Sequence, residues 1–129
     1  MSDNNSTHEA VEIVAAAWQR VLAMDENLVD PKKTRLTYSY PELRVLYPLV
    51  SHGMLQLSRC TDFPWTADVP VIYRRVEGGY VVRRLDRPNG ADDAIVGYTD
   101  TLEDAVALVA ANLPPGCGPA IQGTPDDLD

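Results

Sequence analysis

The chain begins with a hydrophobic pattern that predicts a helix from Thr7 to Met24. Ser6 and Glu9 have the S-x-x-E spacing of a capping box, in which both side chains bond free backbone amides at a helix start. Apolar residues then recur three and four positions apart, so they share one face of the helix. They are Val11, Val14, Ala15, Trp18, Val21 and Leu22. We expect this face, with Trp18 as its largest side chain, to anchor the core.

A connection and a short helix are predicted next. Residues 24–33 contain acidic residues, Asn and Pro, which is typical of a connecting segment. Ser39 and Glu42 repeat the capping-box spacing, and Pro41 falls in the first turn, where its missing N–H costs little. Because the residue before a proline avoids helical geometry, we expect this helix to end before Pro48.

The pattern then changes to a period of two, which predicts strands. Across residues 54–60, leucines alternate with a second set of side chains. Residues 69–85 carry β-branched and aromatic residues on both sides of a Glu-Gly-Gly turn at 77–79, which predicts a β-hairpin. A further short strand is predicted at residues 94–98, after a stretch rich in turn-forming residues.

A second long helix is predicted from Leu102 to about Asn112. Thr99 and Thr101 offer caps, and acidic residues lie in the first turn, where the helix dipole favours them. The buried stripe is expected to contain Leu102, Ala105, Val106, Val109 and Leu113. Pro114 stops the helix, and the Gly, Pro and Asp content of residues 116–129 predicts a loosely ordered acidic tail.

These elements indicate an α+β fold. The connections are mostly too short for parallel crossovers, so we expect a mainly antiparallel sheet of about four strands. Both long helices are expected to pack on one face of that sheet. We interpret residues 1–115 as a single domain, because 129 residues suffice for one compact core and not for two ordinary ones.

Composition and charge limit the classes of partner. Apolar residues make up 45% of the chain, no apolar run is long enough to cross a bilayer, and the polar start lacks the features of a secretory signal. We therefore expect a cytoplasmic protein with no membrane contact. The net charge is −8, and residues 88–129 hold eight acidic residues and no Lys or Arg. This acidity argues against nucleic-acid binding and favours a peptide or protein partner.

The cysteines and histidines give little sign of a metal or cofactor. The chain has two of each, and Cys60 and Cys117 lack the C-x-x-C spacing of metal and redox motifs. Without an export signal, a structural disulfide between them is not expected. We predict no metal and no cofactor.

Residues 51–65, SHGMLQLSRCTDFPW, gather several potentially reactive side chains. His52 and Cys60 are weak catalytic candidates, as base and nucleophile. Eight residues of extended strand separate them by roughly 26 Å, so they cannot form a dyad within one straight strand. A cysteine on a strand is more often a small buried side chain, and His52 equally fits a capping or ligand-binding role.

Two arginines and two aromatic residues of this region are candidate ligand-binding residues. Arg44 and Arg59 either clamp a ligand or tie the short helix to the sheet. Arg59 shares the parity of the strand leucines, so it is expected to point toward the core and to need a carboxylate. Phe63 and Trp65 either cover the edge of the core or form an exposed anchor for a peptide.

The possible carboxylate partners of Arg59 are Asp62, Asp68 and Glu42. A further group of cations, Arg74, Arg75, Arg83 and Arg84, is expected to cluster at the far end of the predicted hairpin.

Residues 41–65, PELRVLYPLVSHGMLQLSRCTDFPW, resemble the central motif of a small family of uncharacterised proteins described as natural-product biosynthesis proteins. That motif reads approximately P-x-L-R-x-L-[YF]-P, then S-H-x-x-L-x-F-S, then Thr, an aromatic residue and P-[WF]. Leu57 departs from it, because the family commonly has an aromatic residue there. The resemblance implies an accessory component encoded near ribosomally made, modified peptides, and it brings no catalytic residues. The matching positions are Pro41, Leu43, Arg44, Leu46, Tyr47, Pro48, Ser51, His52, Leu55, Ser58, Thr61, Phe63, Pro64 and Trp65.

Three hypotheses of function follow. The first is an accessory binding domain that holds a peptide substrate or a partner enzyme through the Arg-rich hairpin and residues 44–65. The second is a small peptide-tailoring enzyme with His52 as its base. The third is an immunity or inhibitor protein whose acidic C-terminal third covers a basic toxin. The sequence leaves the oligomeric state open.

Overall fold

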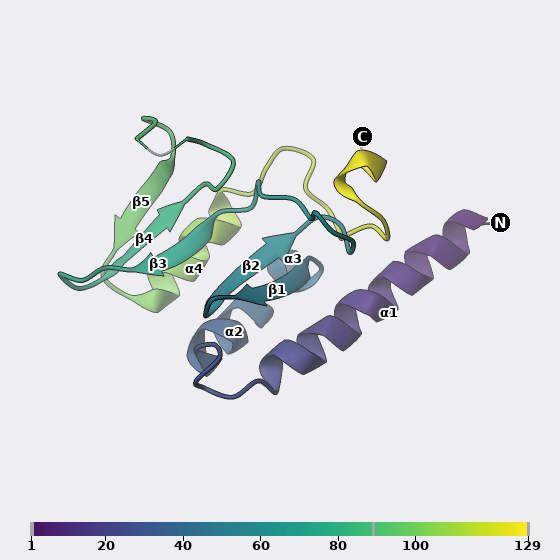
Figure 1. The fold of residues 1–129 in the computed structure, drawn as a ribbon, viewed down its shortest axis with the longest axis horizontal. Coiled ribbons are helices and arrows are strands. Elements are labelled where there is room, and N and C mark those ends of the chain that lie inside the picture. Colours follow the sequence, from purple (N-terminus) through teal and green to yellow (C-terminus); the bar gives the residue numbers. More distant parts are fainter. Residues whose placement is uncertain (1, 89, 129) are drawn as a thin grey trace.

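The computed structural model describes residues 2–88 and 90–128, with side chains from residue 9 onward (Figure 1). The helices are α1 (Ser2–Leu22), α2 (Pro31–Tyr38), α3 (Pro41–Arg44) and α4 (Leu102–Ala111), with a short 3₁₀ turn η1 (Pro125–Asp127). The strands are β1 (Tyr47–Ser51), β2 (Met54–Ser58), β3 (Val71–Arg74), β4 (Tyr80–Arg83) and β5 (Ile95–Thr99). The predicted α+β class is confirmed.

The strands form two small sheets, so the prediction of one four-stranded sheet is wrong. β1 and β2 pair as an antiparallel hairpin, and β3, β4 and β5 form an antiparallel sheet in that order. The predicted hairpin at 69–85 and the strands near 54 and 95 are all present. The two long helices lie on different sheets, because α1 packs against β1 whereas α4 packs against β3, β4 and β5.

β1 and α2 were not predicted, and both have a local physical reason. α3 ends at Arg44, before Pro48 as expected, and Pro48 itself lies within β1, which pairs with β2 alone in the described part of the chain. A proline in an edge strand costs little, since its missing N–H is not needed for pairing. Asp30 and Pro31 begin α2, where the Asp30 carboxylate accepts a hydrogen bond from the Lys32 amide at 3.0 Å.

Neither predicted capping box lies at the start of a helix in the structure. Ser39 donates its hydroxyl to the Leu36 carbonyl at 2.6 Å, so it completes α2 instead of opening α3. Tyr40 precedes α3 without a side-chain cap. α1 already begins at Ser2, and the side chain of Ser6 lies outside the described residues.

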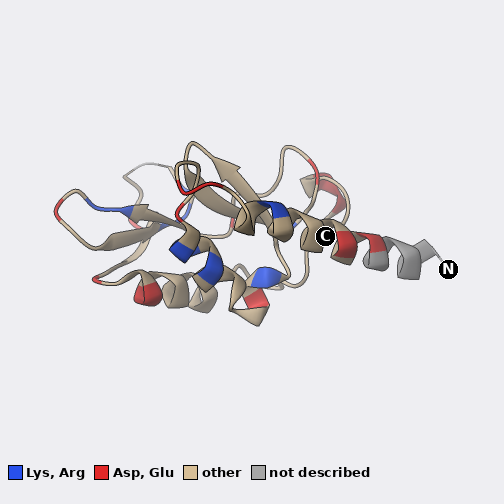
Figure 2. Ribbon diagram, turned by 90° about the horizontal axis from the view of Figure 1, so that it is seen from below, with Lys and Arg blue, Asp and Glu red and all other residues tan. Residues whose placement is uncertain are grey.

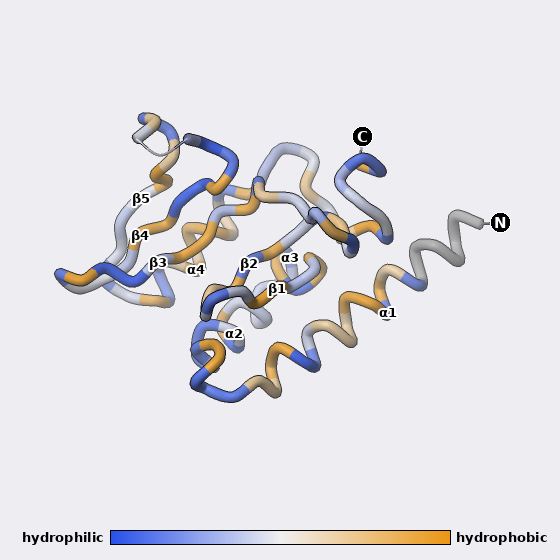
Figure 3. The backbone as a smooth tube through the Cα atoms, viewed as in Figure 1, coloured by the Kyte–Doolittle hydropathy of each residue, from blue (hydrophilic) through white to orange (hydrophobic). Residues whose placement is uncertain are grey.

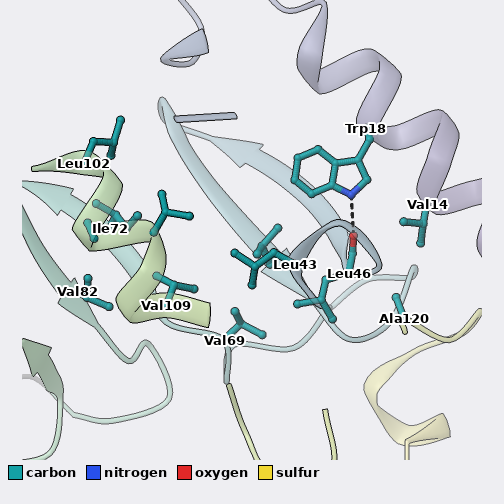
Figure 4. Close-up of a cluster of buried hydrophobic side chains, with 13 residues drawn as sticks. Val14, Trp18, Leu43, Leu46, Val69, Ile72, Val82, Leu102, Val109 and Ala120 are labelled. Carbon is teal, nitrogen blue, oxygen red and sulfur yellow. Dashed lines mark hydrogen bonds between the residues drawn. The ribbon is translucent and has the colours of Figure 1, made fainter. Parts of the chain in front are cut away.

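Trp18 anchors the core, as predicted. Its indole is 1% exposed and donates Nε1–H to the Leu46 carbonyl at 3.0 Å, which ties α1 to the start of β1 (Figure 4). Hydrophobic residues recur along one side of α1 and along the strands (Figure 3). The core does not cover the whole α1 stripe, because Val11 and Ala15 remain exposed. No helix among the described residues is long and apolar enough to span a membrane.

The C-terminal segment, for which the sequence predicts little order, lies against the end of the β1–β2 hairpin. The amide of Ala120 donates to the Val45 carbonyl at 2.9 Å, and the amide of Ile121 donates to the Arg59 carbonyl at 3.0 Å. The amide of Thr61 in turn donates to the Ile121 carbonyl at 3.0 Å, and the segment runs parallel to residues 59–61. Ala120 is also part of the core, which gives this segment an apolar contact in addition to its hydrogen bonds.

Candidate functional site

The β1–β2 hairpin separates the two catalytic candidates. His52 and Gly53 form its two-residue turn with φ values of 54° and 79°, a left-handed pair typical of a type I′ turn. His52 is exposed there. Cys60 lies beyond the other end of β2, which spans five residues, or roughly 17 Å of extended chain. The structure therefore does not bring His52 and Cys60 together.

Cys60 and Ser58 belong to the interior of the protein. Both are fully buried, and Cys60 and Cys117 are free cysteines. The Ser58 hydroxyl donates to the Cys60 carbonyl at 2.7 Å and accepts from the amides of Cys60 and Thr66 at 3.1 Å each. A hydroxyl engaged in this way holds the backbone in place and has no free path to a substrate.

Arg59 has a carboxylate partner, as predicted, although its side chain stays partly exposed. The partner is Asp68, whose Oδ2 accepts from Arg59 Nε at 2.9 Å. Both side chains are about a fifth exposed, at 22% and 21%, and the Asp68 hydrogen bond raises the pKa of Arg59. The pair ties the end of β2 to the segment before β3. Arg59 therefore does not tie the short helix to the sheet, as one of its two predicted roles required.

Burial also raises the pKa of the neighbouring Cys117 thiol. Asp68 Oδ1 is buried and has no hydrogen-bond partner among the described residues.

Phe63 and Trp65 lie in the loop between β2 and β3 and make an edge-to-face contact. Their ring centroids are 5.2 Å apart at an interplanar angle of 84°. Phe63 is 73% exposed, whereas Trp65 is half-buried and donates Nε1–H to the Thr61 carbonyl at 3.1 Å. Of the two predicted roles, the exposed anchor fits Phe63, whereas covering the edge of the core fits the half-buried Trp65.

Arg44 lies beside an apolar groove of about 250 Å³. Its guanidinium stacks over the Tyr38 ring at 5.5 Å and makes one long hydrogen bond, 3.4 Å, to the Ser39 carbonyl. The structure shows no carboxylate paired with Arg44 among the residues it describes. The groove is lined by Val11, Val14, Ala15, Tyr38, Arg44, Val45, Pro119 and Ala120.

Sequence reasoning missed this groove because its walls come from distant segments. α1 supplies the exposed Val11 and Ala15, and the C-terminal segment supplies Pro119. The one available signal was the length of the apolar stripe on α1, which exceeds what a small domain can cover.

The predicted cluster of arginines at the far end of the β3–β4 hairpin does not form. The turn occupies residues 75–79, so Arg74 pairs with Tyr80 beside the turn, whereas Arg83 pairs with Val71 at the other end. Arg75 stacks over the Tyr98 ring at 4.8 Å, and Arg84 bonds the Asp93 carbonyl at 3.5 Å. Arg75 and Arg84 thus make separate local contacts.

A small cavity lies between the two sheets, and Lys33 lines it together with Thr37 and apolar side chains from β2, β3 and α4. Its volume of about 20 Å³ is enough for roughly one water molecule. Lys33 Nζ lies 3.5 Å from the Ile72 carbonyl. Burial lowers the pKa of Lys33, and the charge of Asp30 opposes this effect. The Lys33 side chain thus spans the space between α2 and β3.

The described residues contain no group of three or more His, Cys, Asp and Glu side chains arranged to hold a metal. The groove beside Arg44 and the loop around Phe63 are two places where the described residues expose apolar side chains. Residues 12–124 match the profile of a family of unknown function. The chain belongs to that family, DUF6193. No curated protein and no solved structure matches it.

In this DUF6193 chain, we predict that Ser58→Ala destabilises the fold by roughly 2–3 kcal/mol, because the amides of Cys60 and Thr66 lose a buried acceptor. Ser51→Ala is the matched control, since Ser51 is exposed, and we expect a change within about 0.5 kcal/mol. Urea unfolding followed by tryptophan fluorescence measures both. Equal stability of the two variants would show that the Ser58 hydroxyl does not stabilise the backbone around Cys60 and Thr66.

We further predict that Lys33 titrates below the ordinary lysine value of 10.5, because burial disfavours its charged form. The measurement is the pH dependence of ¹³C-methyl resonances after reductive methylation, with Lys33→Arg to assign the signal. Asp30→Asn is expected to lower the Lys33 pKa further, because it removes a nearby negative charge and keeps a helix-capping side chain. A Lys33 titration at or above 10.5 would contradict this placement.

Proposed function

We propose that this protein is a binding domain that holds the apolar, carboxylate-terminated end of a peptide in the groove beside Arg44. The observation that carries the proposal is the combination of an apolar groove of about 250 Å³ with a guanidinium at its wall. The domain acts as a cytoplasmic accessory component of modified-peptide biosynthesis, a role drawn from the resemblance of residues 41–65 to natural-product biosynthesis proteins.

The apolar character of the groove supports a hydrophobic ligand. Val11 is 57% exposed at its edge, and Val45 and Pro119 extend the apolar lining. Exposed apolar side chains that gather in a concave surface commonly mark a binding site. The volume lies below the roughly 300–1,000 Å³ of pockets for drug-sized ligands, so it suits one or two side chains of a peptide.

Arg44 supports the presence of a carboxylate on that ligand. The Tyr38 ring orients the guanidinium, and the long bond to Ser39 leaves most of its donors available. The planar fork of an arginine matches the two oxygens of a carboxylate. A peptide terminus offers a carboxylate next to an apolar side chain, which is the combination that the groove and Arg44 together require.

Catalysis finds less support. His52 and Cys60 lie at opposite ends of β2, and Cys60 is fully buried. No described contact supplies either residue with a catalytic partner, so binding is the function that the geometry favours.

The test uses fluorescein-labelled hexapeptides that end in Leu, Val or Phe, each made with a free carboxylate and with an amide. We expect the carboxylate forms to bind about tenfold more tightly in fluorescence anisotropy, because a charge-assisted hydrogen bond contributes roughly 1.5–3 kcal/mol. Arg44→Gln should remove this difference. Arg35→Gln, an exposed arginine of α2 outside the groove, should preserve it.

A second pair of variants tests the apolar wall. Val11→Glu places a charge in the groove and is expected to abolish binding of both peptide forms. Ala16→Glu adds the same charge to an exposed position of α1 that does not line the groove, so binding should persist. Equal affinity for acid and amide peptides, or unchanged discrimination in Arg44→Gln, would overturn the proposal.

A further inference from the structure

A second surface lies on the loop between β2 and β3. Phe63 leaves 73% of its side chain exposed, a large apolar exposure for a residue that packs edge-to-face on a half-buried Trp65. Aromatic side chains are enriched at the centres of protein interfaces, where they fill pockets of the partner. Phe63 is therefore placed to act as such an anchor.

The loop holds this aromatic pair in a fixed position. The Thr66 amide bonds the buried Ser58 hydroxyl, and the Thr66 hydroxyl accepts from the Arg59 amide at 2.9 Å. Trp65 has a left-handed φ of 55°, and its amide bonds the Asp62 carbonyl at 3.0 Å. A side chain presented by a rigid loop loses little conformational freedom on binding, which favours affinity.

Acidic side chains lie on this loop and on the C-terminal segment that is hydrogen-bonded to it. Asp62 is exposed next to Phe63, and its amide bonds the Gly123 carbonyl at 2.8 Å. This bond brings η1 and its exposed Asp126 and Asp127 to the same loop. Acidic segments gather near the C-terminus and on the N-terminal half of α1 (Figure 2). The one arginine of the loop, Arg59, is already engaged by Asp68.

We propose that Phe63, Trp65, Asp62, Asp126 and Asp127 form an aromatic–acidic surface that docks a folded protein with an apolar pocket rimmed by Lys and Arg. The exposed ring fills the pocket, and the carboxylates face the basic rim. The acidic residues disfavour anionic lipid and nucleic acid, so a basic protein surface is the complementary partner. This surface goes beyond the proposed peptide groove and uses none of the groove residues.

The first test is site-specific photo-crosslinking with benzoylphenylalanine in place of Phe63, in cells that naturally produce the protein. Matched probes at Val76 and Tyr98 replace exposed side chains on the β3–β4 turn and on β5. We expect one protein to crosslink from position 63 and not from the two control positions. Arg44→Gln should leave this crosslink unchanged, which separates the surface from the groove.

The second test uses the purified partner identified by that crosslink. We expect Phe63→Ala to weaken association at least about tenfold and Val76→Ala to leave it unchanged. Asp126→Asn with Asp127→Asn should weaken association and reduce its dependence on salt. Asp92 and Asp100 are exposed acidic residues elsewhere on the chain. The matched double variant, Asp92→Asn with Asp100→Asn, should change neither the affinity nor its salt dependence.

Three results would overturn the proposal. The first is the absence of a position-specific adduct. The second is an adduct to lipid, nucleic acid or a second copy of this chain. The third is a partner whose crosslinked surface lacks Lys and Arg, or whose binding is insensitive to Phe63→Ala or to the removal of Asp126 and Asp127.

Discussion

The hydrogen bonds of residues 120–123 hold together the open end of the β1–β2 hairpin. Ala120 is hydrogen-bonded to Val45, just before β1. Ile121 and Gly123 are hydrogen-bonded to residues 59–62, just after β2. The same short segment supplies part of the groove wall through Ala120, next to Pro119, and supports the loop that carries Phe63. Both proposed binding surfaces depend on where this segment lies.

The hairpin also divides the residues that looked reactive together in the sequence. Arg44, Arg59 and Phe63 gather beyond its open end, whereas His52 forms the turn at the closed end. Cys60 and Ser58 face inward and stabilise the chain near Thr66. Ser58 and Cys60 thus have structural roles, whereas the exposed ring of Phe63 and the exposed carboxylate of Asp62 are open to solvent.

Sequence patterns predicted the elements whose contacts are local. The α1 stripe, the β3–β4 hairpin and α4 follow from periodicity, and Asp68 was among the carboxylate partners expected for Arg59. β1 was missed because Pro48 suggested a helix end, although an edge strand also tolerates proline. Two sheets in place of one could not be predicted, because strand parity does not specify a partner. The groove required the position of Pro119, more than 100 residues from Val11.

The most direct test is amide hydrogen exchange of the full-length protein by NMR. We predict that the amides of Ala120, Ile121 and Asp62 are protected to a degree comparable with the paired amides of β1 and β2. Such protection would show that the C-terminal segment is stably held against the open end of the hairpin, where both surfaces lie. Exchange of these amides at the rate of an unstructured peptide, with β1 and β2 still protected, would contradict the account.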